Sequence, residues 1–253
     1  AFYTVANTML GTMVLLSDGG ISAGVMSEGG KVWKDKYKLG AVLATGLDLR
    51  KKFAIVSLLV SVPILSYLLM HNGASILTTS LIALALIPSF YAALSDSLLQ
   101  IVPKLHQNII SLQKNQLIVG MGRLFLTALT VFVFPWSFIV ILAAGLPRFL
   151  GNIKLQKIAH VFASKEQKPD NEIRTNILAI VKRQMPESIY FCLSGQINIW
   201  LISIFGSTAA LASLGALGRF SVITVFLTLM FTTLITPRFA RMAEDRKQMQ
   251  KKI

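Results

Sequence analysis

Seven long apolar runs limit what this chain can fold into more than any other feature of its sequence. They cover residues 1–16, 53–70, 76–99, 117–134, 136–150, 189–205 and 209–235. A helix needs about 20 predominantly apolar residues to cross a hydrocarbon core roughly 30 Å thick. The runs are continuously apolar and lack the two-residue alternation of barrel strands. The sequence therefore predicts an all-α, polytopic membrane protein with seven transmembrane helices.

The composition agrees with this prediction. Hydrophobic residues make up 54% of the chain and charged residues only 14%, with a mean hydropathy of +0.64. Soluble domains usually carry about 25% charged residues. The single cysteine, Cys192, lies in the sixth run, which excludes a disulfide framework within the chain and favours a packing role.

The net charge of +14 is distributed unevenly along the chain. Of the 25 Lys and Arg residues, 22 lie in the segments 31–52, 104–114, 154–183 and 238–252. The intervening connections at 71–75, 135–136 and 206–208 contain none. Every second connection is thus basic, and the positive-inside rule places the basic ones in the cytoplasm. A nucleic-acid partner would need these cations on one surface with aromatic platforms, which this distribution does not predict.

The longest polar segment, residues 159–187, is expected to contain an amphipathic helix. Its apolar positions Ile173, Ile177, Ile180 and Val181 recur at helical spacing opposite Arg174, Lys182 and Arg183. Asp170 or Asn171 can cap the start, and Pro186 is expected to interrupt the end. We favour a helix lying in the cytoplasmic headgroup layer over a solvated linker helix.

Five ionisable residues lie inside the predicted spans: Asp18, Asp96, Arg123, Arg148 and Arg219. Such groups usually face a cavity or a charged partner, because a charge in hydrocarbon costs several kcal/mol. Arg219 is about 15 Å of helix from the nearer surface, which favours a water-filled cavity over the alternatives, a different helix boundary or a structural ion pair. Arg123 and Arg148 are each about 9 Å from the basic boundary, so snorkelling and cavity lining both stay open.

The two aspartates and the glycines after Asp18 also have alternative interpretations. Asp18 and Asp96 are expected to form an ordinary cap or ion pair near the inner boundary. The alternatives are neutralisation of Arg123 or Arg148 and a site for a coupling proton or sodium ion. Gly19, Gly20 and Gly24 are candidate hinge residues or a simple end-of-helix turn. No metal site is predicted, because no histidine has a ligand partner at metal spacing.

Three stretches resemble one known family. They are "LLSDGGISAGV" at 15–25, "SGQINIWLISIFGSTAALASLGALGRF" at 194–220 and "LITPRFARM" at 234–242. With the charge alternation, the chain resembles polysaccharide biosynthesis membrane proteins, the lipid-linked oligosaccharide (O-antigen) flippases of the multidrug/oligosaccharidyl-lipid/polysaccharide exporter superfamily. This resemblance implies twelve helices in two bundles around a cavity that opens alternately to either side, of which the chain would be a fragment.

The resemblance also implies a division of the chain. Residues 1–158 would form an N-terminal bundle lacking its first helix, with five spans. Residues 159–187 would form a cytoplasmic linker, and residues 188–253 the first two helices of the second bundle.

The function implied is movement of an undecaprenyl-diphosphate-linked oligosaccharide across the bacterial inner membrane for export of O-antigen, capsule or exopolysaccharide. Guanidinium groups suit this cargo because they bind phosphate oxygens bidentately, and Arg219, Arg148 and Arg123 are the expected cavity cations. Membrane lipids, a polysaccharide polymerase and glycosyltransferases are the expected partners. The alternatives are a cation-coupled multidrug antiporter and a non-transporting scaffold for glycosyltransferases. No catalytic or phosphate-binding motif is visible, so neither enzyme activity nor a cofactor beyond a coupling ion is predicted.

Overall fold

The computed structural model describes residues 2–134, 136–217, 228, 231–236 and 239, and these residues form helices and short connections without a strand. The helices are α1 (Phe2–Asp18), α2 (Ile21–Lys31), α3 (Lys36–His71), α4 (Ile76–Leu99), α5 (Ile101–Leu105), α6 (Ile109–Val133), α7 (Ser137–Phe162), α8 (Asn171–Phe205) and α9 (Thr208–Leu217). A π-helical turn covers Phe231–Ile235. The all-α prediction is therefore confirmed for the described part of the chain.

Side chains fix the starts of three long helices. The Asp35 carboxylate accepts hydrogen bonds from the backbone N–H groups of Tyr37 and Lys38 at the start of α3. Ser75 caps α4 in the same way, and Asp170 accepts from two backbone N–H groups at the start of α8. These caps satisfy donors that the first helical turn leaves free, so the polar connections determine where the helices begin.

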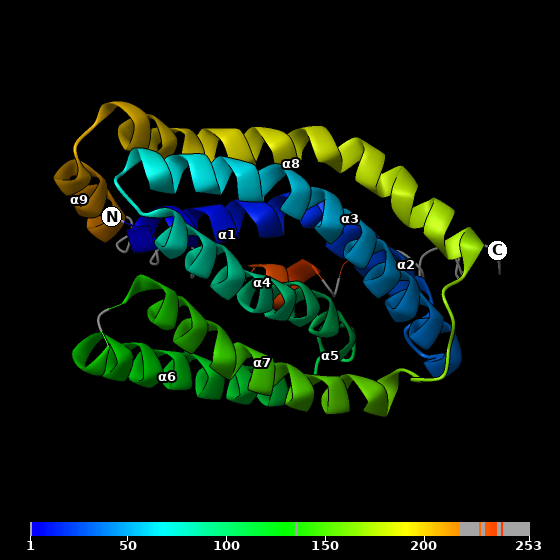
Figure 1. The fold of residues 1–253 in the computed structure, drawn as a ribbon. Helices are drawn as coiled ribbons and strands as arrows, with labels where there is room; N and C mark the ends of the chain where they lie inside the picture. Colours follow the sequence, from blue (N-terminus) through cyan, green and yellow to red (C-terminus); the bar gives the residue numbers. More distant parts are fainter. Residues whose placement is uncertain (1, 135, 218–227, 229–230, 237–238, 240–253) are drawn as a thin grey trace.

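The long helices run roughly side by side, and their connections gather at two opposite ends (Figure 1). The connections α2–α3, α5–α6 and α7–α8 lie at one end, which we call the basic end because Lys34, Lys104 and Lys165 lie in or beside them. The connections α3–α4, α6–α7 and α8–α9 lie at the other end, which we call the neutral end. This is the alternation that the charge distribution predicts.

Among the described residues, five helical segments are long and apolar enough to cross a membrane: α3, α4 with α5, α6, α7 and α8. A sixth is possible if α1 and α2, whose axes differ by 45°, count as one broken span. Integration into a membrane is therefore consistent with the fold. Within the seventh predicted run, 209–235, residues 218–227, 229 and 230 lie outside the described residues, so this span and the twelve-helix parent stay predictions.

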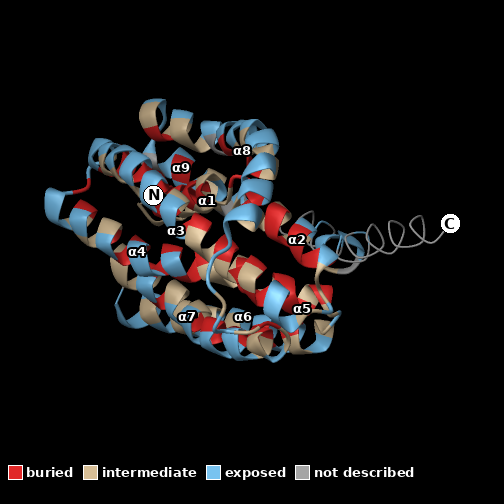
Figure 2. Ribbon diagram, turned by 90° about the vertical axis from the view of Figure 1, so that its right-hand side faces the viewer, coloured by how far each residue is buried: buried red, intermediate tan, exposed pale blue. Residues whose placement is uncertain are grey.

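Exposed apolar side chains cover the outside of the bundle. Helix α6 buries little, and its Phe125 is 69% exposed. Figure 2 shows buried residues concentrated where α1 to α5 meet, whereas α8 presents a largely exposed outer face. Apolar surface of this extent is unfavourable in water and suits contact with lipid.

The buried apolar side chains form two clusters along the length of the bundle. The basic-end cluster contains residues of α2, α5, the first part of α3 and the ends of α7 and α8 nearest the basic connections, among them Ile21 and Ile177. The neutral-end cluster contains residues of α1, α4 and the second part of α3, among them Met13 and Phe90. The core is therefore divided across the helix axes.

The expected end of a helix at Pro186 is wrong, because α8 continues through this residue for a total of 35 residues. Proline removes one backbone hydrogen bond, but packing on neighbouring helices can compensate for that loss. Ile177 and Val181 are buried in the basic-end cluster, and Ile177 packs on Gly24 of α2. The apolar face of this segment therefore contacts protein, which corrects its interpretation as a face that enters the lipid headgroup layer.

Candidate functional site

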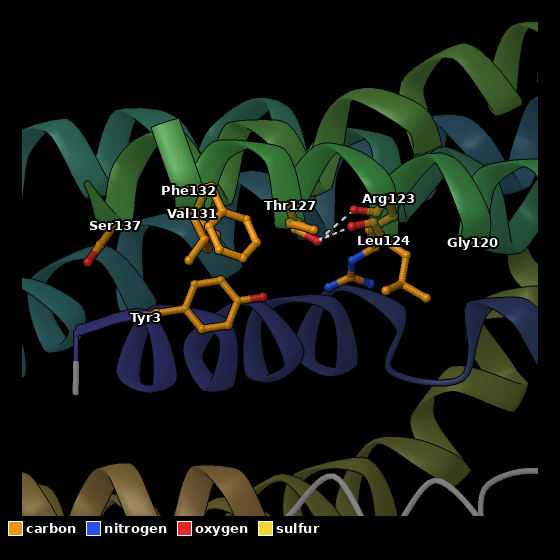
Figure 3. A pocket seen from close by; sticks show the side chains of 10 residues that line it. Tyr3, Gly120, Arg123, Leu124, Thr127, Val131, Phe132 and Ser137 are labelled. Carbon is orange, nitrogen blue, oxygen red and sulfur yellow. Dashed lines mark hydrogen bonds between the residues drawn. The ribbon is translucent and has the colours of Figure 1, made fainter. Parts of the chain in front are cut away.

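A cavity of about 730 Å³ separates α1 from α6 (Figure 3). It is lined by Tyr3, Gly120, Arg123, Leu124, Thr127, Ala128, Val131, Phe132, Ser137 and Val140. A smaller cavity beside it shares Tyr3 and Arg123 and adds Asn7 and Arg148. We call the two cavities together the α1–α6 cleft. It brings together Arg123 and Arg148, two of the three cations predicted from the sequence.

Arg123 lies on the side of α6 that faces α1, and its guanidinium extends into the cleft (Figure 3). One turn further along, the Thr127 hydroxyl donates to the Arg123 carbonyl oxygen at 2.7 Å. Among the described residues, no carboxylate lies within 4 Å of the Arg123 guanidinium. A cation on an apolar helix without a counter-charge needs water or an anionic ligand, and the cleft has room for either.

Arg148 extends from α7 toward α4. Its Nε lies 3.9 Å from Oδ2 of Asp96, and both side chains are only partly exposed. At this separation the two charges attract each other without a short hydrogen bond. Arg148 therefore retains donors that face the narrower part of the cleft, whose volume of about 20 Å³ has room for about one water molecule.

Asp18 lies beside a cation that the sequence did not single out. Its Oδ1 is 3.0 Å from Nη1 of Arg50 on α3. Arg50 belongs to the basic segment 31–52, which the charge pattern assigns to a connection, but its side chain is buried and only 2% exposed. The sequence contained a signal for this burial. The buried face of α3 repeats at helical spacing, and Arg50 continues the series Leu39, Leu43 and Gly46.

The glycines after Asp18 have two different roles. Gly19 and Gly20 have φ angles of +48° and +98°, a left-handed conformation that ends α1 and redirects the chain into α2. Gly24 lies within α2, where an added Cβ would be 2.8 Å from Cγ2 of Ile177. It permits close packing of α8, whereas the break itself is made by Gly19 and Gly20.

Other cleft residues were not found from the sequence. Gly120 and Thr127 are spaced three and four residues from the predicted Arg123, so the three share one face of α6. This spacing could have predicted that Gly120 and Thr127 line the same cleft. Tyr3 and Phe132 carried no comparable signal, because an aromatic residue in an apolar run is usually packed or exposed to lipid. Arg219 lies outside the described residues, so its position in a cavity stays a prediction.

The lining of the cleft combines cations with neutral polar and aromatic groups. Two guanidinium groups lie on α6 and α7, and the hydroxyl groups of Thr127 and Ser137 lie closer to the neutral end. This arrangement can bind an anion next to a neutral hydrophilic group. Within the described ranges, no group of three or more His, Cys, Asp and Glu side chains is placed to hold a metal ion. Comparisons with protein-family models, with curated proteins and with solved structures found no match to this chain.

Proposed function

We propose that this chain forms part of a membrane transporter that moves a polyprenyl-diphosphate-linked oligosaccharide, such as one carried on undecaprenyl diphosphate, across the bacterial inner membrane by alternating access. The observation that carries the proposal is Arg123, whose guanidinium extends into a large cleft and has no carboxylate of the described residues within 4 Å. Arg148 lines the adjoining narrow part of the same cleft. Guanidinium groups bind phosphate oxygens bidentately, and they do so more strongly where water is scarce.

The depth of Arg123 supports a lipid headgroup as the ligand. Arg123 lies about 9 Å of helix from the basic-end border of its apolar run at residue 117. The cleft continues from there along α6 as far as Phe132, about 14 Å further toward the neutral end. A diphosphate at Arg123 would thus keep its polyprenyl tail in the bilayer while its sugars extend along the cleft. With the basic connections in the cytoplasm, the ligand enters from the inner leaflet.

The charge of the cleft favours this cargo over a cationic drug. An antiporter for cationic drugs would be expected to place carboxylates in its binding cavity, because they neutralise the cargo. The described lining residues include neither Asp nor Glu. Asp18 and Asp96 each lie beside an arginine on another helix.

Titration of the purified chain in nanodiscs with a fluorescent undecaprenyl-diphosphate oligosaccharide tests the proposal. A hydrogen bond to a charged group contributes about 1.5–3 kcal/mol, so Arg123→Ala is expected to raise the Kd by about 10- to 150-fold. Arg183→Ala is the matched control, because Arg183 is exposed on α8 outside the cleft. Equal affinity of both variants, or equal binding of the uncharged polyprenol-linked sugar, would contradict the proposal.

The same reagents separate transport from a scaffold role. In proteoliposomes containing the full-length transporter, a flippase makes the labelled lipid in the inner leaflet accessible to a reagent outside. A scaffold for glycosyltransferases would bind the enzymes and leave the labelled lipid in place.

A further inference from the structure

A layer of polar residues separates the two apolar clusters of the core. On α3, Leu49 belongs to the basic-end cluster and Ala54 to the neutral-end cluster, with Arg50 between them. On α4, Leu94 belongs to the neutral-end cluster and Leu98 to the basic-end cluster. The residues between the clusters are Asp18, Gly19 and Gly20 at the α1–α2 break, Arg50 on α3, Asp96 and Ser97 on α4, and Arg148 on α7. We call this set the polar layer.

Arg50 joins four helices within the polar layer. From α3, its Nη1 lies 3.0 Å from Oδ1 of Asp18 at the end of α1 and donates to Ser22 Oγ on α2 at 3.1 Å. The same nitrogen donates to Ser97 Oγ on α4 at 2.5 Å. Ser22 also donates to Asp18 Oδ1 from its hydroxyl group at 2.6 Å and from its backbone N–H at 3.2 Å. A buried charge with these partners holds the helices in one relative position, since losing a partner leaves the charge uncompensated.

Helix α8 packs on the other side of the α1–α2 break, with the residues that directly precede its proline. A Cβ added at Gly19 would lie 2.9 Å from Sδ of Met185, and one added at Gly20 would lie 2.7 Å from Oε1 of Gln184. The next residue of α8 is Pro186, which cannot donate the backbone hydrogen bond that the helix requires there. The break in one helix therefore packs against the point where its neighbour bends most easily.

We propose that the polar layer is a hinge plane, about which the basic-end part of the bundle pivots against the neutral-end part. The pivot lies at the α1–α2 break and at Pro186, and Arg50 holds it in the observed position. The inference depends on these contacts alone and is independent of the cargo. Arg50 is a positioning residue for the cleft, because Tyr3 and Asn7 line the cleft from α1.

The polar layer also reaches the cleft through neighbouring residues of α4. Ser97 contacts Arg50, and the preceding residue, Asp96, lies beside Arg148, which itself lines the narrow part of the cleft. An anion bound to Arg123, which lines both cavities, would attract the Arg148 guanidinium group across the narrow part and weaken its contact with Asp96. Occupancy of the cleft would then alter the position of α4 at the residue that supports the Arg50 contacts.

Distances between spin labels in nanodiscs measure the pivot directly. We place labels at Lys34→Cys, exposed next to the end of α2, and at Ile76→Cys, exposed at the neutral end, with Cys192→Ala as the background. Helix α2 has 11 residues, so a change of about 10° in the 45° bend moves its far end by about 3 Å. Arg50→Ala is expected to shift or broaden the distance distribution by at least this amount.

A matched control separates the hinge from the general loss of an ion pair. Arg174→Ala removes a contact of 2.8 Å to Asp48 that lies outside the polar layer, and it is expected to leave the distribution unchanged. An Arg50→Ala distribution identical to that of the parent protein would overturn the proposal. If Arg50→Ala does not fold, Ser97→Ala decides the matter, because it removes only the contact to α4. A broadened distribution then supports the hinge, and an unchanged one refutes it.

Discussion

Truncation of Ile177 tests whether the amphipathic part of α8 packs on protein. The Ile177 side chain is fully buried in the basic-end cluster, where it contacts α2 at Gly24. Shortening a buried Ile to Ala usually costs about 2–5 kcal/mol, because it removes apolar contacts and leaves a cavity. The next residue, Leu178, is 37% exposed, and substitutions at exposed positions usually change stability by about 0.5 kcal/mol or less. Ile177→Ala is therefore expected to be less stable than Leu178→Ala by at least about 1.5 kcal/mol.

Thermal unfolding in one detergent, followed by intrinsic tryptophan fluorescence, ranks the two variants. In a chain of this size, 1 kcal/mol corresponds to about 2–4 °C in Tm. The Ile177→Ala variant is expected to unfold at least about 3 °C below Leu178→Ala. A segment that lay in the headgroup layer would lose little when either residue is shortened. Equal Tm values for the two variants would therefore refute the packing of α8 on α2.

Three other predictions concern packing, the cleft and orientation. Gly24→Ala is expected to lower the Tm because its Cβ would crowd α8, whereas Gly120→Ala should raise it slightly because nothing lies within 4 Å and alanine favours helix. Phe132→Ala is expected to weaken binding of the glycosylated lipid severalfold and to leave binding of bare polyprenyl diphosphate unchanged in the same titration, because the ring lies in the cleft beyond Arg123. In intact bacteria, a membrane-impermeant maleimide should label Ser75→Cys and leave Lys34→Cys unlabelled, and the reverse pattern would contradict the cytoplasmic placement of the basic end.

The sequence predicted best those features that depend on a long and regular pattern. Continuous apolar runs indicate helices, since a chain in lipid must satisfy its backbone hydrogen bonds internally. The alternation of basic and neutral connections predicted which helix ends lie together, as Figure 1 shows. Asp170 was predicted as a possible helix cap because it directly precedes a helical pattern, and it does cap α8.

Features that depend on tertiary contacts were beyond the sequence. Arg50 stands next to Lys51 and Lys52, both exposed, and looks like part of a solvated basic segment. Its burial results from Asp18, Ser22 and Ser97, which are distant in sequence or on other helices. Pro186 is a helix breaker by its covalent chemistry, and only the packing of α8 on its neighbours keeps the helix continuous. In both cases the local signal was outweighed by contacts that form only after folding.

The polar layer lies close to the borders of the apolar runs. Residue 53 begins one of these runs and residue 150 ends another. Arg50 lies three residues outside the first run, and Arg148 lies two residues inside the second. We infer that the layer lies at the edge of the hydrocarbon, where a charge costs less than at the bilayer centre. The basic-end cluster then lies beyond the hydrocarbon, with Ile177 facing α2 while the exposed Lys182 and Arg183 face water or headgroups. This placement accounts for an amphipathic segment that is buried on one side, and it makes the polar layer the junction between a membrane-embedded part and a basic part outside the membrane.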